Sequence, residues 1–263
     1  MIDGREDQAT GLRRLFRQTP PAVVTLYATG RYRAHNAVRA AYRIAGQRQR
    51  VLLLDEAAGD SALGPVFELT PGPDLLQMLD GRLTLAGLIQ PLPGLLGRVP
   101  TAAAALALPL LDDARRACLI EALKVLHRHA GFVLIHADSE SAEDPSPFVL
   151  AAPNRLVVAE ISARGAAEAY RVIKQLAAAG AGSVHVAAVR AKNRADAERF
   201  FASLRGLVRR HVGVPLLWLG EVENDDIAAG LTRTPLSARD TGAAFLNRLA
   251  ATGAWQAASA FRG

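Results

Sequence analysis

The sequence predicts an α/β fold, a doubly wound and mainly parallel sheet with helices on both faces. Runs such as residues 51–54 and 132–135 are apolar throughout, as is typical of strands buried on both faces. Longer segments with helical periodicity alternate with these runs, as parallel strand pairs require. We therefore expect one α/β domain over residues 21–251, between a short N-terminal helical arm (1–20) and a C-terminal tail (252–263).

Local signals place the individual elements. Apolar side chains recur at helical spacing in residues 6–17, and Pro20-Pro21 ends this arm because proline disfavours helix in the residue before it. Asp74 is placed to cap a helix after the loop Pro71-Gly72-Pro73. Thr252-Gly253 breaks the pattern of the last helix. The expected strands are 23–26, 51–54, 96–99, 132–135, 156–158, 184–189 and 216–219, and the later expected helices are 112–129, 163–179, 194–210, 225–231 and 237–250.

Cysteine usage and hydropathy indicate a reducing cytoplasm. The single cysteine, Cys118, supports neither a disulfide framework nor a cluster of metal-ligating thiols. A membrane span of about 18 uncharged apolar residues is absent, as is the basic-then-apolar order of a signal peptide. The tail offers only Trp255 and Phe261 as bulky apolar groups, so we expect weak or no membrane binding. A peripheral position at the inner membrane or the cell pole stays open.

The net charge of +6 is concentrated near the N-terminus. Residues 1–50 hold ten arginines against three acidic residues, a net of +7. Such a surface fits nucleic acid, anionic lipid or an acidic partner, and equally a solvated arginine-rich face. We expect no nucleic acid, because the sequence has neither aromatic interleaving nor a recognition motif. The arginines concerned are Arg13, Arg14, Arg17, Arg31, Arg33, Arg39, Arg43, Arg48 and Arg50.

The loop after the first strand is the segment that bears most on function. In nucleotide-binding α/β proteins this loop carries glycines and a lysine, because backbone N–H groups at a helix N-terminus must close around phosphate oxygens. Residues 27–35 read Tyr-Ala-Thr-Gly-Arg-Tyr-Arg-Ala-His, with Gly30 as the one glycine and no lysine. The sequence therefore predicts a nucleotide-binding architecture whose nucleotide site is dismantled.

Four short motifs follow one another along the chain. They are residues 7–13 (DQATGLR), residues 50–55 (RVLLLD), Ala169-Tyr170 with Ile173-Lys174, and Leu219-Gly220 followed by Asp225-Asp226. In this order they resemble the MinD/ParA-like deviant P-loop ATPases, and among them the FlhG (also called FleN) regulators of flagellar number and placement. The first motif is the most specific, because it is similar to the Asp-Gln-Ala-x-x-Leu-Arg arm of FlhG proteins.

The residues that this family uses for nucleotide chemistry are replaced. Arg33 stands near the family's final lysine and threonine, Asp55 lacks the family's second aspartate, and His136 ends the strand that normally ends in a Mg²⁺-binding aspartate. Arginine is too wide for a loop built around lysine, and Mg²⁺ demands oxygen ligands. We expect a vestigial nucleotide site with no catalytic residue, metal or cofactor. It consists of Gly30, Arg33, Asp55, His136 and Asp138.

The resemblance implies a non-enzymatic regulator, a pseudo-ATPase that binds and stimulates an FlhF-type GTPase of the signal-recognition-particle class. A flagellar transcription activator or switch component is a further candidate partner. One alternative is a MinD-like, ATP-dependent dimerising membrane switch that holds ATP and Mg²⁺ through Arg33 and Asp138. Another is a ParA-like scaffold in a different export or localisation system. The expected partner-binding residues are Asp7, Gln8, Ala9, Leu12, Arg13 and Phe16.

Overall fold

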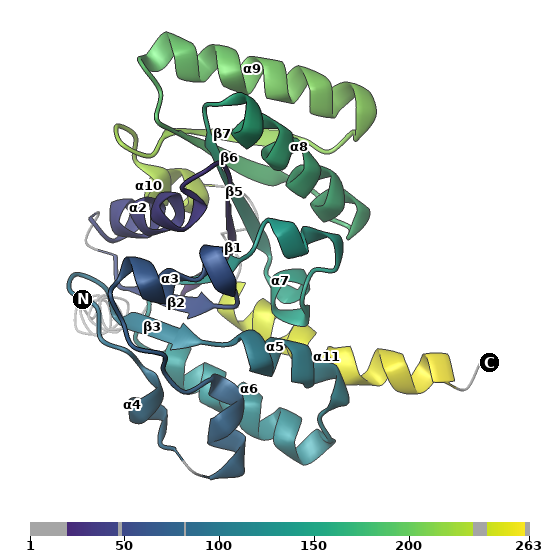
Figure 1. The fold of residues 1–263 in the computed structure, drawn as a ribbon. Coiled ribbons are helices and arrows are strands. Elements are labelled where there is room, and N and C mark those ends of the chain that lie inside the picture. The colour runs from purple at the N-terminus through teal and green to yellow at the C-terminus, as the bar shows by residue number, and fades with distance from the viewer. Residues whose placement is uncertain (1–19, 47–48, 82, 234–240, 261–263) are drawn as a thin grey trace, which may run out of the picture.

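The computed structural model describes residues 20–46, 49–81, 83–233 and 241–260, and it confirms the predicted doubly wound α/β fold (Figure 1). Seven strands form one sheet in the order β3-β2-β4-β1-β5-β6-β7, and each neighbouring pair is parallel. The strands are β1 (Ala22–Ala28), β2 (Val51–Asp55), β3 (Gly97–Pro100), β4 (Phe132–Ala137), β5 (Asn154–Glu160), β6 (Val184–Val189) and β7 (Leu216–Glu221).

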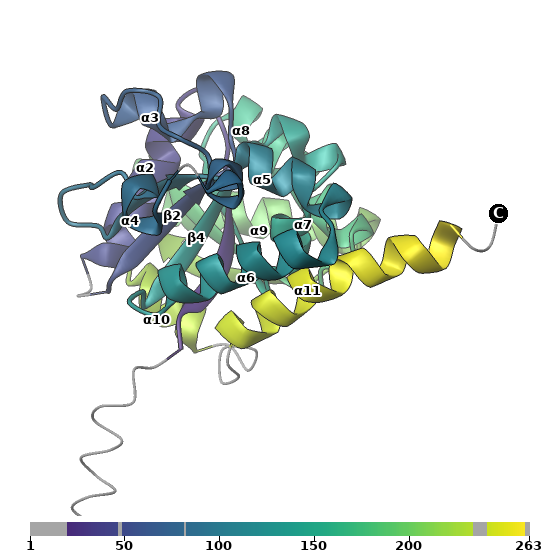
Figure 2. The ribbon, with the colours of Figure 1, turned by 90° about the horizontal axis from the view of Figure 1, so that it is seen from below.

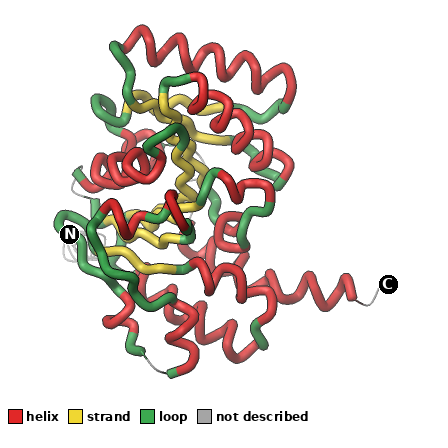
Figure 3. Tube along the Cα trace, in the orientation of Figure 1, coloured by secondary structure: helices red, strands yellow, loops and turns green. Residues whose placement is uncertain are grey.

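Helices cover both faces of the sheet, which forms the central layer in Figure 3. One apolar core lies between the sheet and α2, α3 and α10, and the other between the sheet and α5 to α9 with α11. The α-helices are α2 (Arg33–Ala45), α3 (Leu63–Val66), α4 (Leu85–Leu88), α5 (Ala102–Ala107), α6 (Asp113–His127), α7 (Pro147–Ala151), α8 (Ala163–Ala178), α9 (Arg194–His211), α10 (Ile227–Thr232) and α11 (Thr241–Ala260). Short 3₁₀ helices are η1 (Gly59–Ser61), η2 (Leu75–Asp80), η3 (Leu108–Leu110) and η4 (Glu140–Glu143).

The central strand β1 explains why the apolar runs are continuous. Its side chains alternate between the two cores, with Val23 and Tyr27 on one face and Val24 and Leu26 on the other, so every position needs an apolar or well-partnered side chain. Because the sheet is parallel, all strands end at the same edge. The loops that follow β1, β2, β4 and β5 therefore meet there, and they carry the candidate site.

The expected helices and strands that lie in the described residues are present, although their boundaries differ from those expected. The Asp74 side chain caps η2 by accepting from the Leu76 N–H, although this element is a 3₁₀ helix. Thr252-Gly253 was expected to end the last helix, and this is wrong: α11 runs unbroken to Ala260. Glycine costs a helix only about 1 kcal/mol relative to alanine, and the surrounding residues are alanine-rich. Residues 1–19 of the proposed arm fall outside the described residues, so the arm stays a prediction.

The start of helix α11 is hydrogen-bonded to the beginning of β1. In Figure 2 it lies along α6, and its far end extends beyond the body of the domain. The Thr241 hydroxyl donates to the Pro21 carbonyl and accepts from the Val23 N–H, which ties the start of α11 to β1. Phe245 packs edge-on against Phe148 of α7, with ring centroids 6.2 Å apart. Among the described residues, no helix has the length and apolar character needed to cross a membrane.

We expect Phe245→Ala to destabilise the domain by about 3–5 kcal/mol, because a fully buried aromatic side chain would leave a cavity. Urea unfolding followed by circular dichroism measures the change. Leu110→Ala is the matched control: Leu110 is 85% exposed, so stability should stay within about 0.5 kcal/mol of the parent. Equal losses in the two variants would contradict the packing role of α11.

Candidate functional site

The loop between β1 and α2 is tied to the neighbouring strand β5 and helix α8. The Thr29 hydroxyl donates to the Gly165 carbonyl and accepts from the Glu160 N–H. The Thr29 N–H donates to the Val158 carbonyl at 3.0 Å. These contacts hold the loop against the sheet edge, and Gly30 follows with φ at +92°, a conformation that favours glycine.

Two carboxylates occupy the space that faces Gly30. The Gly30 N–H donates to Glu168 Oε2 at 2.7 Å, and a Cβ placed on Gly30 would meet the Glu160 side chain at 2.5 Å. Asn36 donates to Glu160 Oε2 at 3.3 Å and so holds that carboxylate in place. A phosphate needs free N–H donors and positive potential at this point. The protein supplies its own anions instead, so this part of the loop does not fit a nucleotide.

The start of α2 keeps some features of an anion site. Its N-cap residue Tyr32 makes no side-chain cap, and no acidic residue lies in the first turn, so the orphan N–H groups and the helix dipole favour negative charge. A cavity of about 540 Å³ lies beside it, lined by Arg31, Arg33 and His35. The guanidinium of Arg190 lies over the Tyr32 ring, 5.0 Å from its centroid.

Asp55 at the end of β2 is the centre of a buried ion network. Its Oδ2 accepts from Arg98 at 2.7 Å (Nε) and 2.6 Å (Nη2), and from the Leu63 N–H at 3.1 Å. Its Oδ1 lies 2.8 Å from His136 Nδ1. Burial alone would raise the pKa of Asp55, but the hydrogen bonds and charges of His136 and Arg98 lower it below the usual value. Asp55 is therefore ionised, and His136 Nδ1 is the donor.

This network does not fit the Mg²⁺ that the fold family implies. Both carboxylate oxygens of Asp55 are already used by nitrogen donors. His136 pairs with Asp55 across the β2–β4 register, so an imidazole stands where an oxygen ligand is needed. Among the described residues, no group of three or more His, Cys, Asp or Glu side chains is placed to hold a metal ion.

Arg33 and Asp138 come together, but away from Asp55. Arg33 Nε donates to the Ser61 hydroxyl at 2.5 Å, and this hydroxyl donates to Asp138 Oδ1 at 2.8 Å. The direct distance from Arg33 Nε to Asp138 Oδ1 is 4.0 Å. Asp138 is therefore part of a link between α2, η1 and the end of β4, and it does not replace the aspartate missing at position 136.

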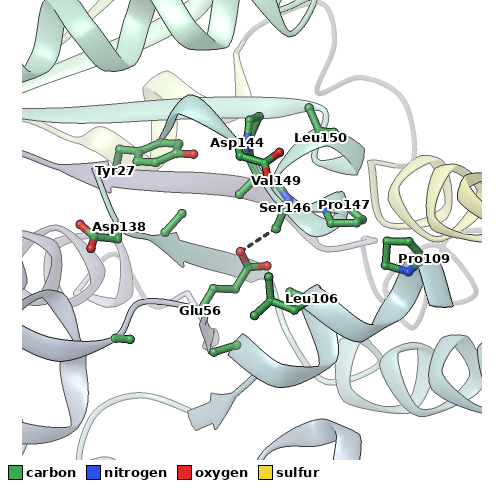
Figure 4. A pocket seen from close by; sticks show the side chains of 15 residues that line it. Tyr27, Glu56, Leu106, Pro109, Asp138, Asp144, Ser146, Pro147, Val149 and Leu150 are labelled. Atoms are coloured by element: carbon green, nitrogen blue, oxygen red, sulfur yellow. Dashed lines mark hydrogen bonds between the residues drawn. The ribbon is translucent and has the colours of Figure 1, made fainter. Parts of the chain in front are cut away.

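A second cavity, of about 500 Å³, opens on the other side of the strand ends. Figure 4 shows Glu56 pointing into it, hydrogen-bonded to Ser146, with a distance of 2.7 Å from Ser146 Oγ to Glu56 Oε2. Burial raises the pKa of Glu56 to about 8, against the lowering effect of Ser146 and with the help of the Asp55 charge. The Glu56 carboxyl is thus largely protonated at neutral pH.

The sequence-predicted residues divide into separate groups. Asp55 and His136 are in contact, Arg33 and Asp138 are joined through Ser61, and Gly30 is bound by Glu168 and lies against Glu160. The predicted arm residues lie outside the described part of the chain. Of the basic face, Arg33, Arg39 and Arg43 contact their own domain.

Sequence reasoning missed the residues that close the site: Glu160, Glu168 and Arg98. Glu168 lies 138 positions from Gly30, and Arg98 lies 43 positions from Asp55. No spacing rule links such pairs. A weak signal was available, since Glu160 ends a strand whose carboxyl end adjoins the phosphate loop, and an acidic residue there disfavours phosphate.

Comparison with solved structures identifies the fold. The chain is similar to a chain of the MinC:MinD cell division protein complex from Aquifex aeolicus, with a TM-score of 0.51 and 18% identity over 86% of this chain and 94% of that one. A ParA family ATPase from Chlorobium tepidum also gives a TM-score of 0.51, with 14% identity over 86% of this chain and 99% of that one. The fold is that of the MinD/ParA-like P-loop ATPases.

Comparison of the sequence narrows this class. The antiactivator FleN of Pseudomonas aeruginosa is 26% identical over 191 residues, which cover 72% of this chain and 68% of FleN. No family model matches the chain. The resemblance to FleN/FlhG-type proteins is thereby confirmed: the chain is FleN-like in sequence and MinD/ParA-like in fold.

We expect Asp55→Asn to destabilise the protein by about 3–5 kcal/mol at pH 7, because it leaves the buried Arg98 charge without its counterion. The lowered pKa of Asp55 in the folded chain means that its contribution is present above about pH 4, the ordinary aspartate value. The contribution is lost as pH falls through the lower folded value. We therefore expect urea unfolding from pH 7 downward to show that the free energies of unfolding of the parent and of Asp55→Asn become more similar in acid.

Asp113→Asn is the matched control for this experiment. Asp113 is solvent-exposed in its pair with Arg116, so its neutralisation should change stability little. A stability difference for Asp55→Asn that stays constant below pH 4 would show that ionisation of Asp55 is not its cause.

Proposed function

We propose that this chain is a FleN/FlhG-type regulator that acts through protein contacts rather than through a nucleotide cycle. The observation that carries the proposal is that the phosphate loop is bonded within the chain: the Gly30 N–H donates a hydrogen bond to Glu168. The similarity to an antiactivator supports a regulatory role. Partners of the proposed kind are an FlhF-type GTPase, engaged by the arm, and a flagellar transcription activator.

Electrostatics supports the loss of nucleotide binding. A triphosphate placed at Gly30 would meet the carboxylates of Glu160 and Glu168 in a part-buried setting, where like charges repel strongly. Displacing Glu168 would also break its 2.7 Å ion pair with Arg164. The metal that normally offsets phosphate charge has no oxygen ligand at position 136, so a metal ion would not offset this repulsion.

An ATP-dependent, MinD-like switch is the second candidate. The uncapped N-terminus of α2 and the cavity lined by Arg31, Arg33 and His35 favour it. Arg33 is, however, hydrogen-bonded to Ser61, and a nucleotide would have to break that contact. Nucleotide binding therefore separates the two candidates directly.

We expect calorimetric titration of the full chain with ATP and Mg²⁺ to give no saturable heat at micromolar nucleotide, and phosphate-release assays to show no hydrolysis. The reason is that the phosphate loop and the Mg²⁺ position are altered together. A saturable signal that Arg33→Ala removes would contradict the pseudo-ATPase proposal. Arg128→Ala is the matched control, because Arg128 is exposed at the end of α6, where β4 begins rather than ends.

We expect a peptide of residues 1–20 to raise the GTPase rate of the cognate FlhF-type protein, because the arm carries the FlhG-like motif. Gln8→Ala or Leu12→Ala in the peptide should remove most of the effect. Gln18→Ala, outside the motif, is the matched control and should keep it. If the peptide is inactive while the intact protein stimulates, the partner surface lies on the folded domain.

A further inference from the structure

The cavity beside Glu56 has the size and enclosure of a binding site. Its volume of about 500 Å³ lies within the range of small-ligand pockets, about 300–1,000 Å³. It lies at the ends of β1, β2 and β4, between α5 and α7 and the loops that adjoin them (Figure 4). Most of the wall is aliphatic, from alanine, proline, leucine and valine side chains.

The polar groups of the cavity favour a cation. Three carboxyl groups line it, from Glu56, Asp138 and Asp144, and none of the lining residues is an arginine, lysine or histidine. Phosphate-bearing ligands would meet carboxyl groups and no basic side chain here. This cavity therefore differs in sign from the one at the start of α2, which arginines line.

Glu56 supplies an unused contact inside the cavity. Its Oε2 is bound by Ser146, whereas its Oε1 is shielded from solvent and has no hydrogen-bond partner among the described residues. A buried polar atom without a partner is costly, by about 1–3 kcal/mol. A ligand that enters the cavity and turns the Glu56 carboxyl group so that Oε1 accepts a hydrogen bond from it would remove this cost.

The rim of the cavity suits a protein segment rather than a small solute alone. Leu106 of α5 is 77% exposed and Leu150 of α7 is 42% exposed, and both line the opening. Exposed leucines grouped around a pocket are typical of interaction sites. Arginine and lysine combine an aliphatic stem with a cationic head, which matches aliphatic walls that lead to a carboxyl group.

We propose that this cavity binds the side chain of an arginine or lysine presented by a protein segment whose neighbouring residues are apolar. The cationic head pairs with Glu56, the stem contacts the aliphatic wall, and the flanking apolar residues cover Leu106 and Leu150. On binding, Glu56 releases its proton to solvent and the carboxylate accepts hydrogen bonds from the cation. The site is independent of the proposed loss of nucleotide binding.

The test uses isosteric pairs that differ in charge. The full chain is titrated by calorimetry with the peptide Leu-Ala-Arg-Ala-Leu and with its citrulline counterpart, in which a neutral urea replaces the guanidinium. A parallel pair, n-butylguanidinium and n-butylurea, lacks the flanking leucines. We expect the arginine peptide to bind most tightly.

The pH dependence of peptide affinity tests whether Glu56 is the group that contacts the cation. Because this carboxyl must ionise to pair with a cation and its pKa is about 8, affinity for the arginine peptide should rise roughly tenfold from pH 7 to pH 9. Arginine stays charged over this range. In Glu56→Gln the affinity should fall at least about tenfold, and the rise with pH should disappear. Glu143→Gln, an exposed acid nearby, is the matched control and should behave as the parent.

The remaining measurements distinguish a cation that a protein segment presents from a free small-molecule cation. Leu106→Ser should weaken the arginine peptide but leave n-butylguanidinium unchanged, since only the peptide reaches the rim. Equal binding of both guanidinium ligands with no effect of Leu106→Ser would overturn the protein-segment part of the proposal. Equal binding of the arginine and citrulline peptides, no binding of any probe, or full binding by Glu56→Gln would overturn the site itself.

Discussion

The ion network around Asp55 is the interaction on which this end of the molecule depends. It joins β2, β3 and β4 and holds the N–H that starts α3. In a MinD/ParA-like protein this edge of the sheet is where a metal ion would stand. Here the positive charge comes from Arg98, and His136 Nδ1 donates a hydrogen bond to the same carboxylate. A buried aspartate without a counterion would be very costly, so Arg98 meets a requirement of the fold.

In the phosphate loop, too, the chain pairs its own polar groups, but here the partner that it supplies is an anion. Its N–H donors also need partners, and Glu168 provides one at Gly30. The cation near Asp55 and the anion near Gly30 are thus both supplied by the chain itself.

The cavity beside Glu56 adjoins the same strand ends as the Arg33–Ser61–Asp138 link. Asp138 lies between the two regions, linked to Arg33 through Ser61 on one side and lining the cavity on the other. Occupation of the cavity by a cation would compete with Arg33 for the charge of Asp138.

The sequence by itself determined the fold class and the altered nucleotide positions, because apolar runs, helical periodicity and single replaced residues such as His136 are local signals. It also placed Asp74 and the approximate strand limits. The tertiary structure alone decided which groups compensate: Glu168 for Gly30 and Arg98 for Asp55. These pairs are brought together by strand order and register across a parallel sheet. That order depends on how helices pack on both faces, so no spacing along the chain encodes it.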